Sequence, residues 1–227
     1  MIIKWIGQSG YILNDGEIEI CIDPYLSDIV NKVEGKERLV PCPIEPENLN
    51  SDVVICTHDH LDHLDPEGIE KMDKENKVFV CPPKCVKHLN ELGAEHIVEL
   101  NKGQTTTFGG FTITAVFADH TVETIGLLIV HGGKTLYFSS DTLYNKKLEE
   151  MKEYDIDYMF ICINGKLGNM NVDEAIKLTS IIKPKVSIPS HYGMFASNTE
   201  NPQIYIEGVE NGFEMQFNKK YSLNEIG

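Results

Sequence analysis

The sequence is nearly free of arginine. Arg38 is the only arginine, and the chain has 20 basic residues against 35 acidic ones, which gives a net charge of −15. Proteins that bind nucleic acid need clustered basic side chains to displace counterions from phosphates, and anionic membrane surfaces attract the same kind of cluster. The charge balance therefore argues against nucleic acid and against a membrane as partners, and it leaves a small-molecule substrate as the expected partner.

Long apolar runs and targeting signals are also missing. No stretch approaches the ~20 apolar residues that span a bilayer. The opening MIIKWIGQSGYIL lacks the basic start and small-residue cleavage site of a signal peptide, so we expect a cytoplasmic protein. We find no internal repeat and no linker rich in Gly, Ser or Pro. With 227 residues, 41% of them hydrophobic, we expect one domain over residues 1–227.

The cysteines do not suggest a disulfide framework. Cys21, Cys56 and Cys162 lie inside apolar runs, where a free thiol packs as a small hydrophobe. Cys81 and Cys85, in CPPKC, could form a metal or redox pair, but a structural zinc site needs two further ligands and none follows nearby. We therefore expect reduced thiols.

The hydrophobic periodicity predicts short strands at first and then strands that alternate with helices. Asn171 and Glu174 have the spacing of a capping box at the start of a helix that ends before Pro184. This content indicates two mixed sheets with helices outside. We predict strands at 2–6, 11–14, 17–22, 53–57, 78–81, 96–100, 105–108, 111–117, 125–131, 134–139, 158–163, 186–190 and 214–218, and helices at 66–75, 83–92, 144–152, 172–182 and 202–211.

Residues 24–50 form the least regular part of the sequence. They hold four prolines and show little periodicity. A loop of this length inside a compact domain is usually functional or mobile. We expect a flap beside the functional site.

The stretch THDHLDHLD, residues 57–65, follows an apolar strand. His58 and His60 stand two apart, so in an extended segment their imidazoles leave the same side. Asp62 and His63 follow where the chain should turn. Imidazole and carboxylate suit Zn²⁺, Mn²⁺ or Fe²⁺. Four ligands this close would crowd a single ion, so the spacing favours two ions, one at His58 and His60 and the other at Asp62 and His63.

Further candidate ligands follow other apolar strands. His120 follows AVFAD, Asp141 follows LYFSS, and His191 follows VSIPS. Chemistry in α/β proteins gathers at the carboxyl ends of strands. A single histidine or aspartate at such a place is more often structural, as we expect for the histidines at 88, 96 and 131, but together with HDHLDH these three indicate a metal site.

The order of these motifs resembles the metallo-β-lactamase superfamily. The resemblance rests on THDHLDH, a later His, the Asp of SDT and the His of SHY, which are spread over residues 57–192. The resemblance implies an αββα sandwich, that is, two mixed β-sheets flanked by helices. It also implies one ion held by His58, His60 and His120, a second held by Asp62, His63 and His191, and Asp141 as the bridge between them.

A narrower resemblance is to the L-ascorbate-6-phosphate-lactonase-like branch. It rests on WIGQSGYIL, RLVPCPIEPENL, NGKLGNMNVDEAIKL and KPKVSIPSHYGMFASN. It implies hydrolysis of a small anionic ester or lactone of the phosphorylated-sugar type, and such relatives tend to form homo-oligomers.

This ligand set implies a dinuclear hydrolase with two divalent ions, Zn or Mn first and Fe as a further option. A water shared by two such ions loses its proton near neutral pH and becomes the nucleophile. Asp62 could accept that proton, and His191 or His120 could stabilise the oxyanion. For an anionic substrate, we name Lys166 and Asn171, in the loop before a helix N-terminus, and Arg38 in the flap as candidate binding residues.

Three other functions share part of this pattern. A phosphodiesterase or nuclease would use the same ligands, but the net charge counts against it. A redox enzyme of the flavo-diiron type would be expected to carry Glu where His60 stands. A non-catalytic metal-binding protein is the third, although all seven ligand positions are filled.

Overall fold

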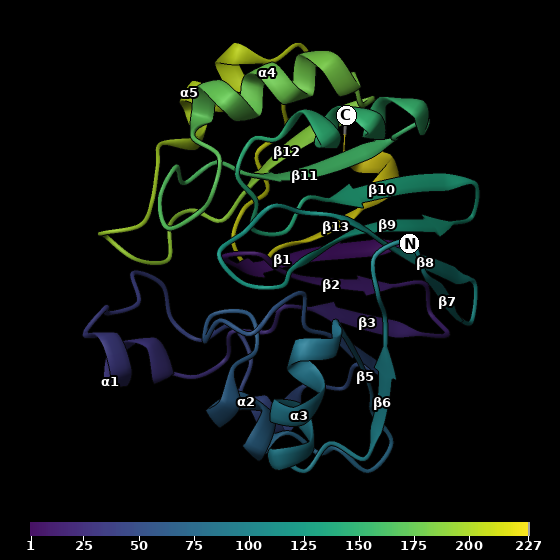
Figure 1. Cartoon of the computed structure of the whole chain (residues 1–227), viewed down its shortest axis with the longest axis vertical. Coiled ribbons are helices and arrows are strands. Elements are labelled where there is room, and N and C mark those ends of the chain that lie inside the picture. The colour runs from purple at the N-terminus through teal and green to yellow at the C-terminus, as the bar shows by residue number, and fades with distance from the viewer. Residues whose placement is uncertain (227) are drawn as a thin grey trace.

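The computed structural model describes residues 1–226. Two β-sheets pack face to face, and helices cover both outer faces (Figure 1). In sheet order, the first sheet consists of β13 (Lys220–Ser222), β1 (Ile2–Gly7), β2 (Gly10–Asn14), β3 (Glu19–Ile22), β4 (Val53–Ile55), β5 (Val78–Cys81) and β6 (His96–Glu99). The second consists of β12 (Val186–Ser190), β11 (Tyr158–Cys162), β10 (Lys134–Phe138), β9 (Ile125–His131), β8 (Phe111–Phe117) and β7 (Thr105–Phe108).

Both sheets mix parallel and antiparallel neighbours. In the first, β13, β1, β2 and β3 pair antiparallel, whereas β3 to β6 pair parallel. In the second, β10, β11 and β12 pair parallel, and β7 to β10 pair antiparallel. This confirms the predicted αββα sandwich of two mixed sheets.

Alternating side chains build two apolar layers. In β3, Ile20 and Ile22 point into the core between the sheets, whereas Cys21 points into the layer under the outer helices. In β4, Val53 and Ile55 point inward and Val54 outward in the same way. This is the period of two that a strand buried on both faces requires.

The cysteines lie free in these layers. Cys21, Cys56, Cys81 and Cys85 belong to the apolar cluster on the outer side of the first sheet. Burial raises the pKa of the Cys81 thiol to about 12, so this thiol is protonated at neutral pH.

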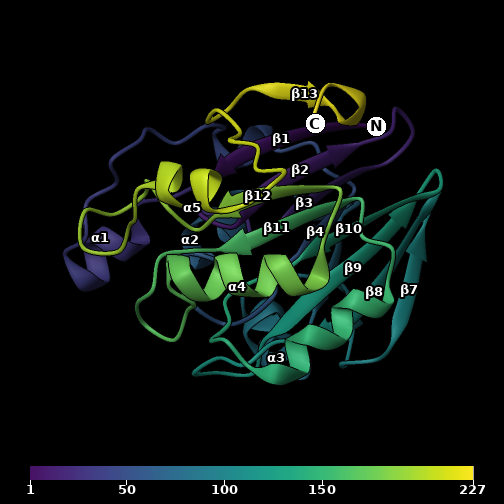
Figure 2. The same ribbon diagram turned by 90° about the horizontal axis from the view of Figure 1, so that it is seen from above.

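Helices α2 (Pro66–Lys71) and α3 (Pro83–Glu91) lie on the first sheet (Figure 1). Helices α4 (Val172–Ile182) and α5 (Pro202–Gly208) lie on the second (Figure 2). The predicted capping box is confirmed, because the Asn171 side chain accepts from the Glu174 N–H and the Glu174 carboxylate accepts from the Asn171 N–H. No helix within residues 1–226 has both the length and the apolar character that crossing a bilayer requires.

Four predicted elements need correction. The strand predicted at 214–218 is wrong. There the chain crosses from the second sheet to the first. The Phe213 N–H donates to the Ser187 carbonyl and the Asn218 N–H donates to the Trp5 carbonyl. The segment therefore forms no continuous β-ladder with either sheet. The helix predicted at 144–152 is a 3₁₀ helix, η2 (Lys146–Glu153). The helices predicted at 66–75 and 202–211 end earlier, at Lys71 and Gly208. Two shorter 3₁₀ turns complete the chain, η1 (Pro46–Asn48) and η3 (Leu223–Glu225).

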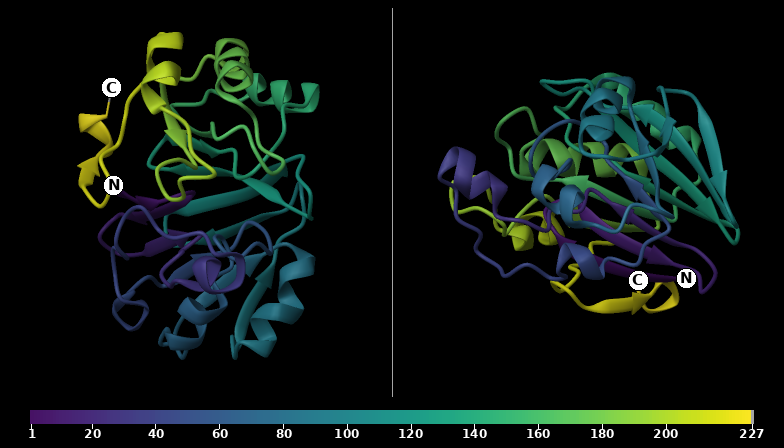
Figure 3. Two further views of the ribbon diagram at one scale, coloured as in Figure 1. Left: turned by 90° about the vertical axis from the view of Figure 1, so that its left-hand side faces the viewer. Right: turned by 90° about the horizontal axis from the view of Figure 1, so that it is seen from below.

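The irregular segment 24–50 contains a helix that the sequence did not predict, α1 (Ile29–Glu34). It stands clear of both sheets (Figure 3). The segment is tied to the loop after β12, because the Leu39 N–H donates to the Met194 carbonyl and Arg38 forms a β-bridge with Phe195. Residues 24–50 therefore lie beside the end of β12, where the predicted ligand His191 follows.

Candidate metal centre

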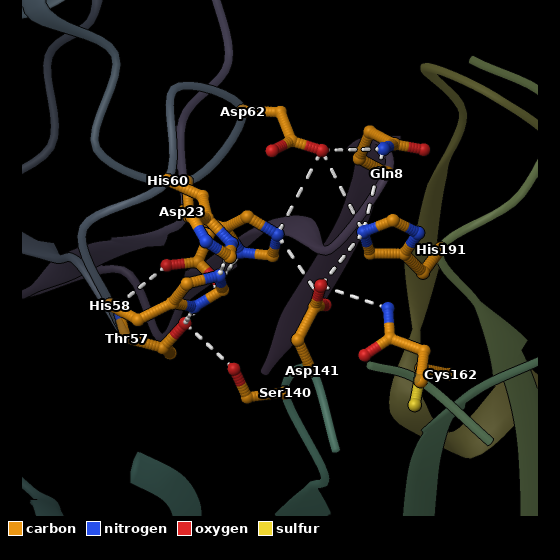
Figure 4. A network of polar contacts seen from close by, with 12 residues as sticks. Gln8, Asp23, Thr57, His58, His60, Asp62, Ser140, Asp141, Cys162 and His191 are labelled. Atoms are coloured by element: carbon orange, nitrogen blue, oxygen red, sulfur yellow. Dashed lines mark hydrogen bonds and ion pairs between the residues drawn. The ribbon is translucent and has the colours of Figure 1, made fainter. Parts of the chain in front are cut away.

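All seven predicted metal ligands follow strand ends at one edge of the sandwich. His58, His60, Asp62 and His63 lie in the loop after β4, and the other three follow strands of the second sheet, His120 after β8, Asp141 after β10 and His191 after β12. Strands β8, β10 and β12 run in the same direction, so their carboxyl ends meet. The packing of the two sheets then brings both sets together (Figure 4).

Three imidazoles form the first group. The Nε2 atom of His58 lies 3.0 Å from Nδ1 of His60, and Nε2 of His120 lies 3.2 Å from that same Nδ1. His58 is fully buried and the other two are partly buried. Three nitrogens that converge in this way can hold one divalent cation.

The second group consists of Asp62, His63 and His191. The Oδ2 atom of Asp62 lies 3.9 Å from Nε2 of His63 and 3.7 Å from Nε2 of His191. These separations are too long for hydrogen bonds and leave room for an ion at the centre.

Asp141 stands between the two groups. Its Oδ1 atom lies 3.4 Å from His63 Nε2, and its Oδ2 atom lies 3.2 Å from His191 Nε2 and 3.8 Å from His120 Nε2. One carboxylate therefore faces ligands of both groups, as a bridging ligand would.

Orphaned atoms show that the cluster fits a cation. His63 Nε2 and Asp141 Oδ1 are buried without a hydrogen-bond partner among the described residues. Buried polar atoms left unpaired cost roughly 1–3 kcal/mol each. Both atoms are good ligands for Zn²⁺ or Mn²⁺, so a bound ion would remove this cost.

Outer contacts fix the orientation of the ligands. His63 Nδ1 lies 2.8 Å from Oδ2 of Asp23, which also accepts from the Thr57 hydroxyl at 2.7 Å. The Asn169 amide donates to Asp141 Oδ2 at 2.8 Å, and the Gly168 carbonyl lies 3.0 Å from His120 Nδ1. A carboxylate or carbonyl behind a histidine is typical of metal sites, because it sets the tautomer. The sequence analysis did not predict that Asp23 and Asn169 contact the ligands, because neither residue lies in a metal-ligand motif.

The electrostatics differ between the two groups. Burial and the neighbouring His63 hold the pKa of His58 well below its usual value, so this imidazole is neutral. Burial would also lower the pKa of His63, but the carboxylates of Asp141, Asp23 and Asp62 outweigh it and raise that pKa well above the usual value. In the second group a bound cation would therefore displace the proton from His63.

Backbone strain concentrates at the cluster. Positive φ angles occur at Gln8 and Asp23, which contact candidate ligands, at Ser140, which precedes Asp141, and at His191, which is itself a candidate ligand. Such conformations cost energy and persist where surrounding contacts enforce them, often at functional sites.

A pocket of about 350 Å³ opens over the cluster. Its polar lining includes His60, Asp62, Asp141, His191 and Asn169, its apolar lining includes Leu61, Leu167 and Phe195, and the segment 24–50 contributes Val30, Glu34 and Lys36. The expected flap segment therefore forms one wall of the pocket.

The three predicted substrate-binding residues do not line this pocket. Arg38 donates to the carbonyls of Tyr25, Ser27 and Val40, which ties the segment 24–50 together. Lys166 donates to the Ser197 carbonyl, and Asn171 caps α4. Their role in substrate binding stays a prediction, and Lys36 is the basic residue that the structure brings to the pocket.

An αββα sandwich that gathers histidines and aspartates at its strand ends defines a class of metal-binding α/β proteins. A family described as Beta-lactamase superfamily domain matches residues 19–192. The chain belongs to this family, and thus to the metallo-β-lactamase superfamily.

Named relatives agree with this assignment. The chain is 25% identical over 223 residues to a UPF0173 metal-dependent hydrolase of Archaeoglobus fulgidus, covering 92% of this chain and 91% of the relative. It is 29% identical over 217 residues to the protein of that name from Pyrobaculum islandicum, with 92% of each chain covered.

Two solved structures share the fold. A possible metal-dependent hydrolase from Veillonella parvula has a TM-score of 0.82 at 16% identity, covering 97% of this chain and 98% of the other. An isothiocyanate hydrolase from Delia radicum gut bacteria has a TM-score of 0.79 at 17% identity, with 98% of each chain covered.

Proposed function

We propose that this protein is a metal-dependent hydrolase with two divalent ions, Zn²⁺ or Mn²⁺ first and Fe²⁺ as a further option. The observation that carries the proposal is the position of Asp141, whose carboxylate faces both ligand groups. The names of the relatives support hydrolysis. His58, His60 and His120 would hold one ion, Asp62, His63 and His191 the other, and Asp141 would bridge.

Divalent ions at these positions would lower the pKa of a water molecule and polarise the substrate as Lewis acids. The chain supplies the remaining parts. Asp62 lines the pocket, and only its Oδ2 atom contacts Gln8 and the two histidines, so the second oxygen is available to accept a proton. His191 also lines the pocket; as a ligand of the second ion it would act on negative charge at the substrate through that ion, and as a free imidazole it would act by a hydrogen bond of its own.

We propose a small anionic ester or lactone as the substrate. The pocket volume of about 350 Å³ suits a metabolite rather than a polymer. Apolar side chains of Leu61 and Phe195 would contact the body of the substrate, and Lys36 would face its anionic group. The sequence motifs shared with lactonase-like proteins support a phosphorylated sugar lactone in particular. The expected cytoplasmic location and homo-oligomer stay predictions.

A substrate panel tests this function. Protein loaded with Zn²⁺ or Mn²⁺ would be assayed on lactones with and without phosphate, on simple esters, on a phosphodiester and on structured RNA. An isothiocyanate is included because one protein of the same fold is named for that activity. We expect two ions per chain and turnover of an ester or lactone.

The variant His60→Ala tests whether turnover depends on the metal site. His60 Nδ1 is the atom on which the first group converges, so we expect metal content to fall and hydrolysis to drop by about a thousandfold or more. Turnover of RNA in place of lactones would identify a nuclease. Two bound ions without turnover of any compound would identify a non-catalytic metal-binding protein.

A further inference from the structure

Gln8 is a buried polar residue that is not one of the seven ligands. It lies in the turn between β1 and β2, is fully buried, and has a φ of 49°. This is the left-handed region of backbone conformation, which residues other than glycine rarely adopt. A residue held there must be fixed by its contacts, and those contacts lead to the second ligand group.

The backbone carbonyl of Gln8 accepts three hydrogen bonds. The donors are the indole Nε1 of Trp5 at 2.9 Å, the backbone N–H of His191 at 3.1 Å and the Ser190 hydroxyl at 3.2 Å. His191 also has a positive φ, of 59°. The carbonyl of Gln8 thus fixes the backbone that aims the His191 imidazole at the cluster.

The side chain of Gln8 reaches the other ligand of the group. Its Nε2 atom donates to Asp62 Oδ2 at 2.7 Å and lies 3.5 Å from His191 Nε2 (Figure 4). The opposite amide orientation would place the amide oxygen against a carboxylate oxygen at that distance, and the two would repel. The orientation of the amide is therefore set by Asp62.

We propose that Gln8 is a positioning residue for the second metal group, holding Asp62 through its side-chain amide and His191 through its backbone carbonyl. This inference rests on the proposed metal cluster. Partners behind metal ligands typically contribute about 10- to 100-fold to metal affinity. The contribution of Gln8 is confined to one group, because none of its contacts reaches His58, His60 or His120.

Two variants distinguish the role of the Gln8 side-chain amide from an effect on folding. Gln8→Glu keeps the shape of the side chain and removes the N–H donor. Gln8→Gly removes the side chain, relieves the strain of the positive φ and keeps the backbone carbonyl. Gln104→Glu makes the same chemical change at an exposed turn and serves as the matched control.

The measurement is a Co²⁺ titration of metal-free protein, followed by visible absorbance and calorimetry, with the thermal midpoint of each metal-free variant as a check of folding. We expect two binding steps in the wild type. In both Gln8 variants, one step should weaken about tenfold or more and the other should keep its affinity, whereas Gln104→Glu should match the wild type.

Other results would overturn the inference. These are unchanged affinities in both variants, equal weakening of both steps, or weakening in Gln8→Glu alone, which would indicate charge repulsion rather than lost positioning. A wild type that binds fewer than two ions would contradict the two-ion proposal and this inference together, so the two failures can be told apart.

Discussion

At the scale of single residues, two side chains of the cluster each have a ligand atom without a hydrogen-bond partner among residues 1–226. Asp23 holds His63 from behind and Asn169 holds Asp141, yet His63 Nε2 and Asp141 Oδ1 find no partner in the described part of the chain. The same contacts that fix these side chains leave these buried atoms free to bind an ion. These unpaired atoms lower the stability of the metal-free protein, and they are the atoms that the proposed function requires.

Lys36 is the residue on which substrate charge should depend. It lines the pocket and pairs with Glu34, whereas Lys166 lies outside the lining. We expect Lys36→Ala to raise KM about fivefold for an anionic lactone and to leave its uncharged analogue nearly unchanged, since an exposed ion pair is worth up to ~1 kcal/mol. Steady-state kinetics on both compounds would measure this. A larger effect from Lys166→Ala would favour the residue predicted from the sequence.

At the scale of elements, the loops after the strands carry the chemistry, and one of them leaves no room for a side chain. Gly168 lies in the loop between β11 and α4 with a φ of 92°, and a Cβ atom there would come within 2.8 Å of His120 Nδ1. Its carbonyl lies 3.0 Å from that same nitrogen. The loop backbone therefore packs directly against a ligand of the first group.

We expect Gly168→Ala to lower both stability and metal content. The positive φ alone costs about 1–2 kcal/mol for a residue with a Cβ atom, and the clash displaces His120 in addition. Gly103→Ala is the matched control, because Gly103 has a φ of 88° and open space around its Cβ position. Thermal unfolding and metal analysis would compare the two. Equal metal content in both variants would contradict the role given to the loop.

At the scale of the whole molecule, the second sheet is tied together at the end opposite the metal ligands. Asp157 accepts from Lys134 at 3.2 Å, from Lys185 at 3.0 Å and from the Thr135 N–H at 2.9 Å, so it joins the starts of β10, β11 and β12. Burial would raise the pKa of Asp157, but the Thr135 hydrogen bond and the two lysines outweigh it and lower that pKa. The carboxylate form is therefore favoured in the folded protein.

This shift makes stability depend on pH. Because the folded-state pKa lies below the unfolded value of about 3.9, the contribution of Asp157 is present above that pH and is lost as the pH falls through the folded-state pKa. We expect Asp157→Asn to cost about 1–2 kcal/mol at pH 7 and progressively less towards pH 3. Denaturant unfolding across this range would measure it. Asp155→Asn, at an 88% exposed side chain that pairs with Lys185, should show little effect at any pH.

The sequence by itself predicted the seven candidate ligands and the layered fold, and the structure brings these side chains together. Hydrophobic alternation, strand-end histidines and the capping box of Asn171 and Glu174 are local patterns, and the forces behind them act between residues close in the chain. The strand predicted at 214–218 is wrong because the backbone is bonded to a different sheet at each end of the segment, at Phe213 to Ser187 and at Asn218 to Trp5, and these partners are distant in the sequence.

Only the tertiary structure decided which residues support the ligands and line the pocket. Gln8 meets Asp62 across 54 positions and His191 across 183, and the segment around α1 brings Lys36 rather than Arg38 to the pocket. Such contacts arise when the two sheets pack and their loops meet at one edge. Each depends on the path of the whole backbone, which residue spacing along the chain does not specify.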